Sequence, residues 1–174
     1  MTKNPTFQPA LFQDDANGAV IDGPYRYTLW RTWTSGAALC GWVMLNPSSA
    51  SADVDDPTIR RCVGYAKAWG FGGIVVRNLF ALRATDPAAL ISAVDPVGPD
   101  NNAWLSGRWD GVERVVVAWG TGRYPRLCGD RWEQVAALLA PMRPVCLREG
   151  GNGQPVHPLY QPSTLVPSPW TAGS

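Results

Sequence analysis

The chain has 174 residues, which is enough for one domain with a hydrophobic core and too few for two comfortable domains. Hydrophobic residues make up 45% of the chain and charged residues 17%, a balance that excludes a disordered protein. The formal net charge of +1 is too small to indicate a surface for duplex DNA.

The sequence offers little for metal or membrane chemistry. None of the four cysteines lies within metal-ligand spacing of another, and the chain has a single histidine. No stretch resembles a signal peptide, and no apolar run approaches the ~20 residues of a membrane span. We therefore expect a cytoplasmic protein with no metal, no cofactor and no membrane partner.

The first half of the chain predicts an arm, two strands and a helix. Residues 1–24 are polar and contain several Pro and Gly residues, which predicts a loose N-terminal arm. Residues 25–33 alternate large and polar side chains, as in a half-exposed strand. Residues 38–45 form an apolar run typical of a strand buried on both faces. Asp56 and Pro57 then predict the start of a helix that ends at Gly70.

The second half predicts further alternation of strands and helices. Residues 74–80, 112–119 and 144–147 form buried strands, with helices over residues 85–92, 100–108 and 130–140. Residues 161–174 are a Pro-rich surface tail, so the domain spans residues 25–160. This order predicts an α/β three-layer sandwich around a central, mostly parallel, four-stranded sheet, with an additional N-terminal antiparallel strand.

Polar residues gather where the predicted strands end. Asn46 and Pro47 follow the strand over residues 38–45, and Asn78 lies near the end of the next strand. Gly120 follows the third strand, and His157 comes after the fourth. Because ligands bind beyond the carboxyl ends of parallel strands, we expect a polar ligand site at this edge of the sheet.

Three of these residues can have either a chemical role in a ligand site or an ordinary structural role. The amide of Asn46 can orient a water molecule, or it can simply end the strand in an Asn-Pro turn. Asn78 can read the edge of a base, or it can bond to neighbouring backbone groups. His157, the only histidine, can close over a ligand from its glycine-rich hinge, or it can be an exposed loop residue.

Acidic, basic and aromatic residues flank this edge. Asp53, Asp55 and Asp56 can supply a general base or hold a hard metal ion, although Asp56 also fits a helix cap. Asp53 is the catalytic candidate among them. Arginine suits phosphate, and aromatic rings stack on bases. The substrate-binding candidates are Pro47, Ser48, Arg60, Asn78, Phe80, Arg83, Trp119 and Gly120.

Several segments of the chain resemble a widespread bacterial and phage family of domains of unknown function. The first is the string Met44-Leu45-Asn46-Pro47-Ser48, and the likeness extends over roughly residues 25–160. The other matching segments are residues 56–62, 78–87, 98–101, 118–120 and 157–159.

The order of these motifs is also similar, more distantly, to the uracil-DNA glycosylase superfamily. That resemblance implies a glycosylase-like fold in which Asn46 positions the attacking water, Asn78 reads the base and the loop of His157 contacts it. The glycine that the superfamily places two residues before its Asn or Asp is absent here, because Met44 occupies that position.

These observations lead to three functional hypotheses. The first is an enzyme that hydrolyses an N-glycosidic bond in a nucleotide or in single-stranded nucleic acid, with Asn46, His157 and Asp53 as catalytic residues. The second is a non-catalytic module that binds a nucleotide, a nucleobase or a modified base. The third is a Mg²⁺-dependent hydrolase built on the aspartates of residues 53–56.

Overall fold

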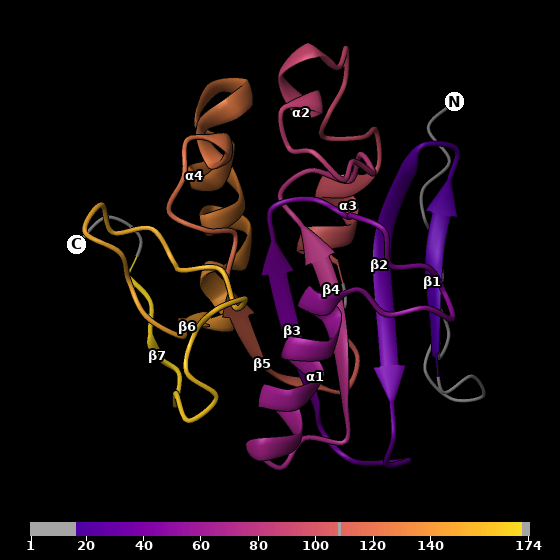
Figure 1. The fold of residues 1–174 in the computed structure, drawn as a ribbon, viewed down its shortest axis with the longest axis vertical. Coiled ribbons are helices and arrows are strands. Elements are labelled where there is room, and N and C mark those ends of the chain that lie inside the picture. The colour runs from indigo at the N-terminus through magenta and orange to yellow at the C-terminus, as the bar shows by residue number, and fades with distance from the viewer. Residues whose placement is uncertain (1–16, 108, 172–174) are drawn as a thin grey trace.

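A computed structural model describes residues 17–107 and 109–171, which fold around a mixed seven-stranded sheet (Figure 1). Its strands are β1 (Asn17–Asp22), β2 (Tyr25–Thr32), β3 (Leu39–Met44), β4 (Gly73–Asn78), β5 (Val112–Val117), β6 (Val145–Cys146) and β7 (Ser168–Pro169). Its helices are α1 (Pro57–Ala68), α2 (Ala89–Ser92), α3 (Asn101–Ser106) and α4 (Leu127–Leu139). The predicted α/β class is confirmed.

The sheet is larger than the sequence predicted. Its strand order is β1-β2-β4-β3-β5-β6-β7, instead of four strands with one antiparallel addition. β3 pairs in parallel with β4 and β5, and β5 pairs in parallel with β6. The outer pairs β1–β2, β2–β4 and β6–β7 are antiparallel. The carboxyl ends of β3, β4 and β5 therefore share one edge, and β2 begins at that same edge.

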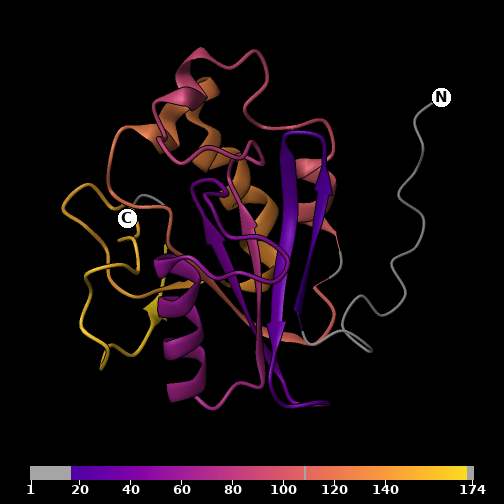
Figure 2. The same ribbon diagram turned by 45° about the vertical axis from the view of Figure 1, so that its right-hand side comes forward.

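Helices cover both faces of the sheet (Figure 2). The buried side of α1 packs on one face through Ile59, Cys62 and Tyr65, which share a cluster with Trp42 of β3. α3 and α4 contribute Leu105, Trp132, Val135 and Leu139 to a second cluster, which contains Val43 of β3 and Val117 of β5. Both faces of β3 are buried as predicted, because successive side chains enter different clusters.

Local chemistry fixes both ends of α1. A side-chain oxygen of Asp56 accepts a hydrogen bond from the backbone N–H of Ile59 at 2.8 Å, and Pro57 occupies the first turn. At the other end Gly70 has φ +84°, a left-handed conformation that ends helices. The predicted cap and the predicted stop of this helix are therefore both confirmed.

The expectation that residues 25–33 form a half-exposed strand is wrong. Six of the eight residues of β2 are buried, including Arg26, Thr28 and Arg31. The cause is the position of β2, which lies between β1 and β4 inside the sheet. The alternation of large and polar side chains therefore marks buried polar groups here and not a solvent-facing side.

The described sheet extends beyond both of the boundaries predicted for the domain. Residues 17–22 of the predicted arm form β1, and residues 1–16 lie outside the described residues. The predicted tail contributes β7 to the sheet, and Trp170 is buried against Trp119 and Trp132. The described part of the domain therefore extends at least from residue 17 to residue 170.

Candidate functional site

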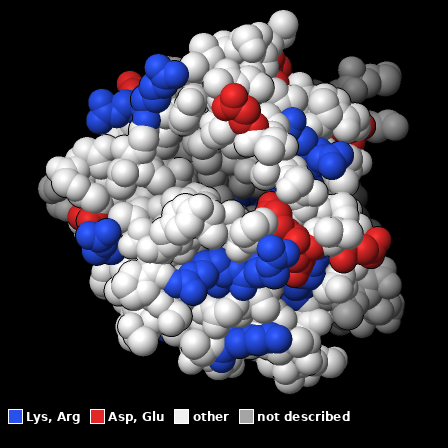
Figure 3. Space-filling model, viewed as in Figure 1, with Lys and Arg blue, Asp and Glu red and all other residues white. Residues whose placement is uncertain are grey.

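A cavity of about 230 Å³ opens where β3 and β5 end and α1 begins. Its polar lining comes from segments far apart in the sequence, namely Arg26, Asn46, Ser48, Asp56, Thr58, Thr85 and His157. The face drawn in Figure 3 is hollowed near its middle, and acidic and basic side chains stand next to one another beside the hollow. The cavity lies at the edge of the sheet where the sequence predicted a site.

The amide of Asn46 is held in one orientation. Its Nδ2 donates to the backbone oxygen of Ala84 at 2.8 Å and to that of Pro47 at 3.0 Å. The N–H of Ala84 donates in turn to the oxygen of Pro47 at 2.9 Å, which ties the two loops together. With both N–H groups directed at carbonyls, Oδ1 makes no hydrogen bond within residues 17–107 and 109–171, and it can accept one from a ligand.

His157 presents a neutral imidazole to the cavity. The backbone N–H of Leu159 donates to Nδ1 of His157 at 3.2 Å, so in the neutral ring the proton sits on Nε2. Burial lowers the pKa of His157, and the negative charge of Asp56 opposes this effect without cancelling it. Nε2 is therefore a hydrogen-bond donor that carries no formal charge at neutral pH.

Asp56 serves the helix and the cavity together. One carboxylate oxygen, Oδ1, caps α1, and the residue also lines the cavity. In the described part of the chain Oδ2 accepts no hydrogen bond. The sequence offered Asp53, Asp55 and Asp56 as possible bases, favoured Asp56 as a helix cap and named Asp53 as the catalytic residue. The signal that could have pointed to Asp56 is its position, because the N-terminus of a helix that follows a strand faces the ligand edge of the sheet.

Trp119 forms an apolar wall of the cavity. The ring is only 2% exposed, and its Nε1 donates to Oε1 of Gln154 at 2.8 Å. Trp170 packs against it edge-on, with the ring centroids 5.1 Å apart. The adjoining Gly120 has φ +94° and donates its N–H to the oxygen of Pro155 at 3.0 Å, which brings the loop of His157 beside the end of β5.

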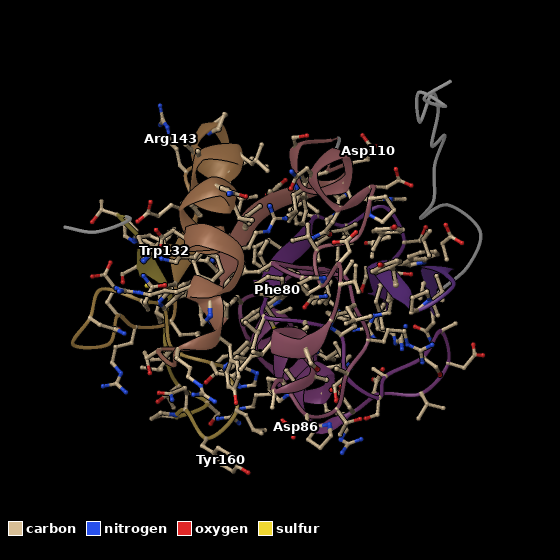
Figure 4. The ribbon with its side chains drawn as sticks, turned by 90° about the horizontal axis from the view of Figure 1, so that it is seen from above. Phe80, Asp86, Asp110, Trp132, Arg143 and Tyr160 are labelled. Atoms are coloured by element: carbon tan, nitrogen blue, oxygen red, sulfur yellow. The ribbon has the colours of Figure 1, made fainter. Side chains whose placement is uncertain are left out.

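Two of the predicted base-binding residues do not line the cavity. Asn78 is 1% exposed, and none of the described residues makes a hydrogen bond to its side-chain amide. It is paired in register with Met44, which does line the cavity. Phe80 is fully buried in the core on the α4 side, and Figure 4 shows it in the interior with Asp86 and Tyr160 at the periphery.

The charged candidates from the sequence also lie elsewhere. Asp53, Arg60 and Arg83 are exposed and are not among the residues that line the cavity. Nη1 of Arg60 donates to the backbone oxygen of Asp55 at 2.7 Å. Asp55 itself is paired with Arg31, with 2.7 Å between Oδ1 and Nε. Across the described residues no group of three or more His, Cys, Asp and Glu could hold a metal ion.

Sequence reasoning missed Arg26. It lies at the start of β2 with 2% of its surface exposed, and it lines the cavity. Nη1 donates to the backbone oxygen of Ala50, while Nε is buried without a partner among the described residues. Burial lowers the pKa of Arg26 to about 10, so the side chain is still charged at neutral pH.

Comparisons with known proteins identify a family but not an activity. Residues 26–159 match the model of a family described as a protein of unknown function, DUF1643. No curated protein and no solved structure matches the chain. No helix within the described ranges is long and apolar enough to cross a membrane. Since the match spans most of the chain, this protein belongs to the DUF1643 family, as its motifs indicated.

Proposed function

We propose that this protein hydrolyses an N-glycosidic bond in a nucleotide or in single-stranded nucleic acid. The observation that carries the proposal is the set of groups that meet in the cavity: the free amide oxygen of Asn46, the carboxylate of Asp56 and the Nε2–H of His157. Hydrolysis of such a bond needs a water molecule held by acceptors and a donor for the departing base. These three side chains supply both.

In the proposed reaction Asn46 and Asp56 hold the attacking water through Oδ1 and Oδ2, respectively. The water oxygen forms a bond to the anomeric carbon of the sugar, and the bond from that carbon to the base nitrogen breaks. The electron pair of the broken bond moves onto the base, where the Nε2–H of His157 stabilises the developing negative charge. Asp56 takes the proton of the water and returns it through solvent to the released base.

The proposal includes a fold related to the uracil-DNA glycosylase superfamily. Its support is the position of two motifs: Asn46-Pro47 directly follows β3, and His157-Pro158 lies in a late loop beside the same cavity. The parallel pairing of β3 with β4 and β5, between layers of helices, agrees with such an arrangement. Trp119 is the wall on which the base stacks in this proposal, and Asn78 is not assigned the reading of the base edge, since it does not line the cavity.

The test is release of free base from a panel of nucleosides, nucleotides and single-stranded oligonucleotides, measured by chromatography. We expect release from at least one nucleotide substrate, with a loss of about 100-fold or more in Asn46→Ala and in Asp56→Asn. Asp53→Asn is the matched control, because Asp53 is exposed on the neighbouring loop, and its rate should equal that of the unmodified protein.

Two results of the release assay would contradict the proposed hydrolysis, and a third would point to binding alone. Absence of release from every substrate, or equal release by Asn46→Ala, would overturn the proposed hydrolysis. A rise in the unfolding temperature with a nucleotide, without any release, would instead assign the cavity to a non-catalytic binding module.

A further inference from the structure

Arg26 is a buried arginine whose hydrogen-bonding capacity is largely unused. A guanidinium carries five N–H donors. Within the described residues the side chain of Arg26 makes one hydrogen bond, from Nη1 to the backbone oxygen of Ala50. Nε is fully buried and has no partner there. The charge of Asp56 acts on Arg26 from a distance, but no described carboxylate lies within ion-pair distance of it, so the cation is not neutralised by contact.

Arg31, five residues further along the same strand, provides the comparison. Its Nε is paired with Asp55 at 2.7 Å, and its Nη2 donates to the oxygen of Ser51 at 2.8 Å. Nη1 donates to the oxygen of Trp30, also at 2.8 Å. Arg31 is thus a satisfied structural residue, although it is about as buried as Arg26. Burial on β2 therefore does not by itself explain the unused donors of Arg26.

The unused donors of Arg26 belong to a side chain that lines the cavity. An arginine held away from water without an anion is unfavourable, and a bound anion relieves that cost. Its planar fork suits two oxygens of a phosphate or a carboxylate. We propose that Arg26 binds an oxyanion in the cavity, and that this oxyanion is the phosphate group of the ligand. That the ligand is a nucleotide rests on the proposed function.

Neighbouring groups fit a phosphate beside a base. Ser48, Thr58 and Thr85 line the same cavity, and a hydroxyl group can donate to a remaining phosphate oxygen. Asp56 also faces the cavity, and its negative charge disfavours an anion that carries more charge than Arg26 can balance. The phosphate can come from a free nucleotide or from a strand of nucleic acid, and the two sources call for separate measurements.

Calorimetric titration of the full chain tests this assignment. The probes are inorganic phosphate, a panel of nucleoside 5′-monophosphates, the matching nucleosides, and a short single-stranded oligonucleotide. We expect a phosphate-bearing probe to bind at least about 10-fold more tightly than its nucleoside. Arg26→Gln should weaken that binding by about 10- to 100-fold, the size of a lost charge-assisted hydrogen-bonding pair. Arg26→Lys keeps the positive charge but lacks the planar fork of the guanidinium. Its affinity for the phosphate-bearing probe should therefore lie between those of the unmodified protein and Arg26→Gln.

The control is Arg60→Gln, which removes the same charge from an exposed residue near the cavity. Equal weakening by Arg60→Gln and Arg26→Gln would overturn the assignment, because it would show a diffuse effect of charge. A nucleoside that binds as tightly as its nucleotide would overturn it too. If Arg26→Gln fails to fold, as judged by circular dichroism, the comparison of Arg26→Lys with the unmodified protein decides in its place.

Failure of this inference is separable from failure of the proposed hydrolysis. Base release that is equally fast from nucleosides and nucleotides, and unchanged in Arg26→Lys, would retain the hydrolysis and remove the phosphate site. Phosphate-dependent binding that is lost in Arg26→Gln, without base release from any substrate, would retain the phosphate site alone. Binding of the monophosphate but not the oligonucleotide would identify a free nucleotide as the ligand, and the reverse would identify a nucleic-acid strand.

Discussion

Burial and charge act in opposite directions on His157. Removal from water disfavours the imidazolium form, and the nearby negative charge of Asp56 favours it. Burial is the larger effect, so the pKa of His157 lies below its usual value of 6.5. The neutral ring, with its proton on Nε2, is the form that the proposed hydrolysis uses.

This shift predicts a pH dependence of stability. The unfolded chain binds a proton at His157 at a higher pH than the folded chain does, so stability rises with pH through this window. The contribution is fully present above about pH 6.5 and is lost as pH falls through the lower, folded pKa. Thermal unfolding of the unmodified protein and of His157→Gln between about pH 5 and 8 checks this. The difference between the two should widen towards neutral pH, and parallel profiles would contradict the expected shift.

At the scale of elements, the loop over residues 46–56 is secured by the buried side of β2 and by α1. Arg26 bonds to Ala50, Arg31 bonds to Ser51 and Asp55, and Asp56 caps α1. The start of α1 therefore fixes the position of the carboxylate that the proposed hydrolysis needs. Asp56 therefore has a structural role as the cap of α1 and a proposed chemical role as the base. Suitable substitutions of Asp56 can separate these two roles.

We expect Asp56→Ala and Asp56→Asn to differ in stability but not in activity. Alanine removes the cap of α1 and should lower the free energy of unfolding by about 1 kcal/mol, whereas asparagine is a cap as good as aspartate. Neither side chain can take a proton from water, so base release should be lost in both. Urea denaturation and the release assay are measured on the same preparations. An Asp56→Asn protein that retains full activity would exclude Asp56 as the base.

At the scale of the whole molecule, the sequence predicted those features that leave a local signal. The apolar run of β3 identified that strand, and Asp56, Pro57 and Gly70 identified the two ends of α1. The rule for strand ends placed Asn46 and His157 at one edge. The sequence did not predict Arg26 as a site residue, because β2 is antiparallel to β4 and begins, instead of ending, at that edge. The sequence did not predict β7, because a two-residue strand that contains proline has no periodicity. Both depend on pairing between distant segments.

The C-terminal segment tests how far that long-range pairing supports the fold. Tyr65 Oη donates to the oxygen of Pro162 at 2.7 Å, and Trp69 Nε1 donates to that of Leu165 at 3.1 Å. Trp170 is 5% exposed and packs on Trp119 and Trp132. Loss of a buried tryptophan costs about 3–5 kcal/mol, and each hydrogen bond about 1 kcal/mol. A chain that ends at residue 160 loses all of these contacts.

We therefore expect the chain ending at residue 160 to unfold at a clearly lower urea concentration than the full chain. A variant that ends at residue 171 keeps Trp170 and β7 and serves as the control, with a midpoint equal to that of the full chain. The shorter chain should also bind ligand more weakly, because Trp119 loses the ring that supports its wall of the cavity. If the two truncated chains unfold at the same urea concentration, residues 161–171 do not contribute to stability. The stable domain would then end at residue 160, as the sequence predicted.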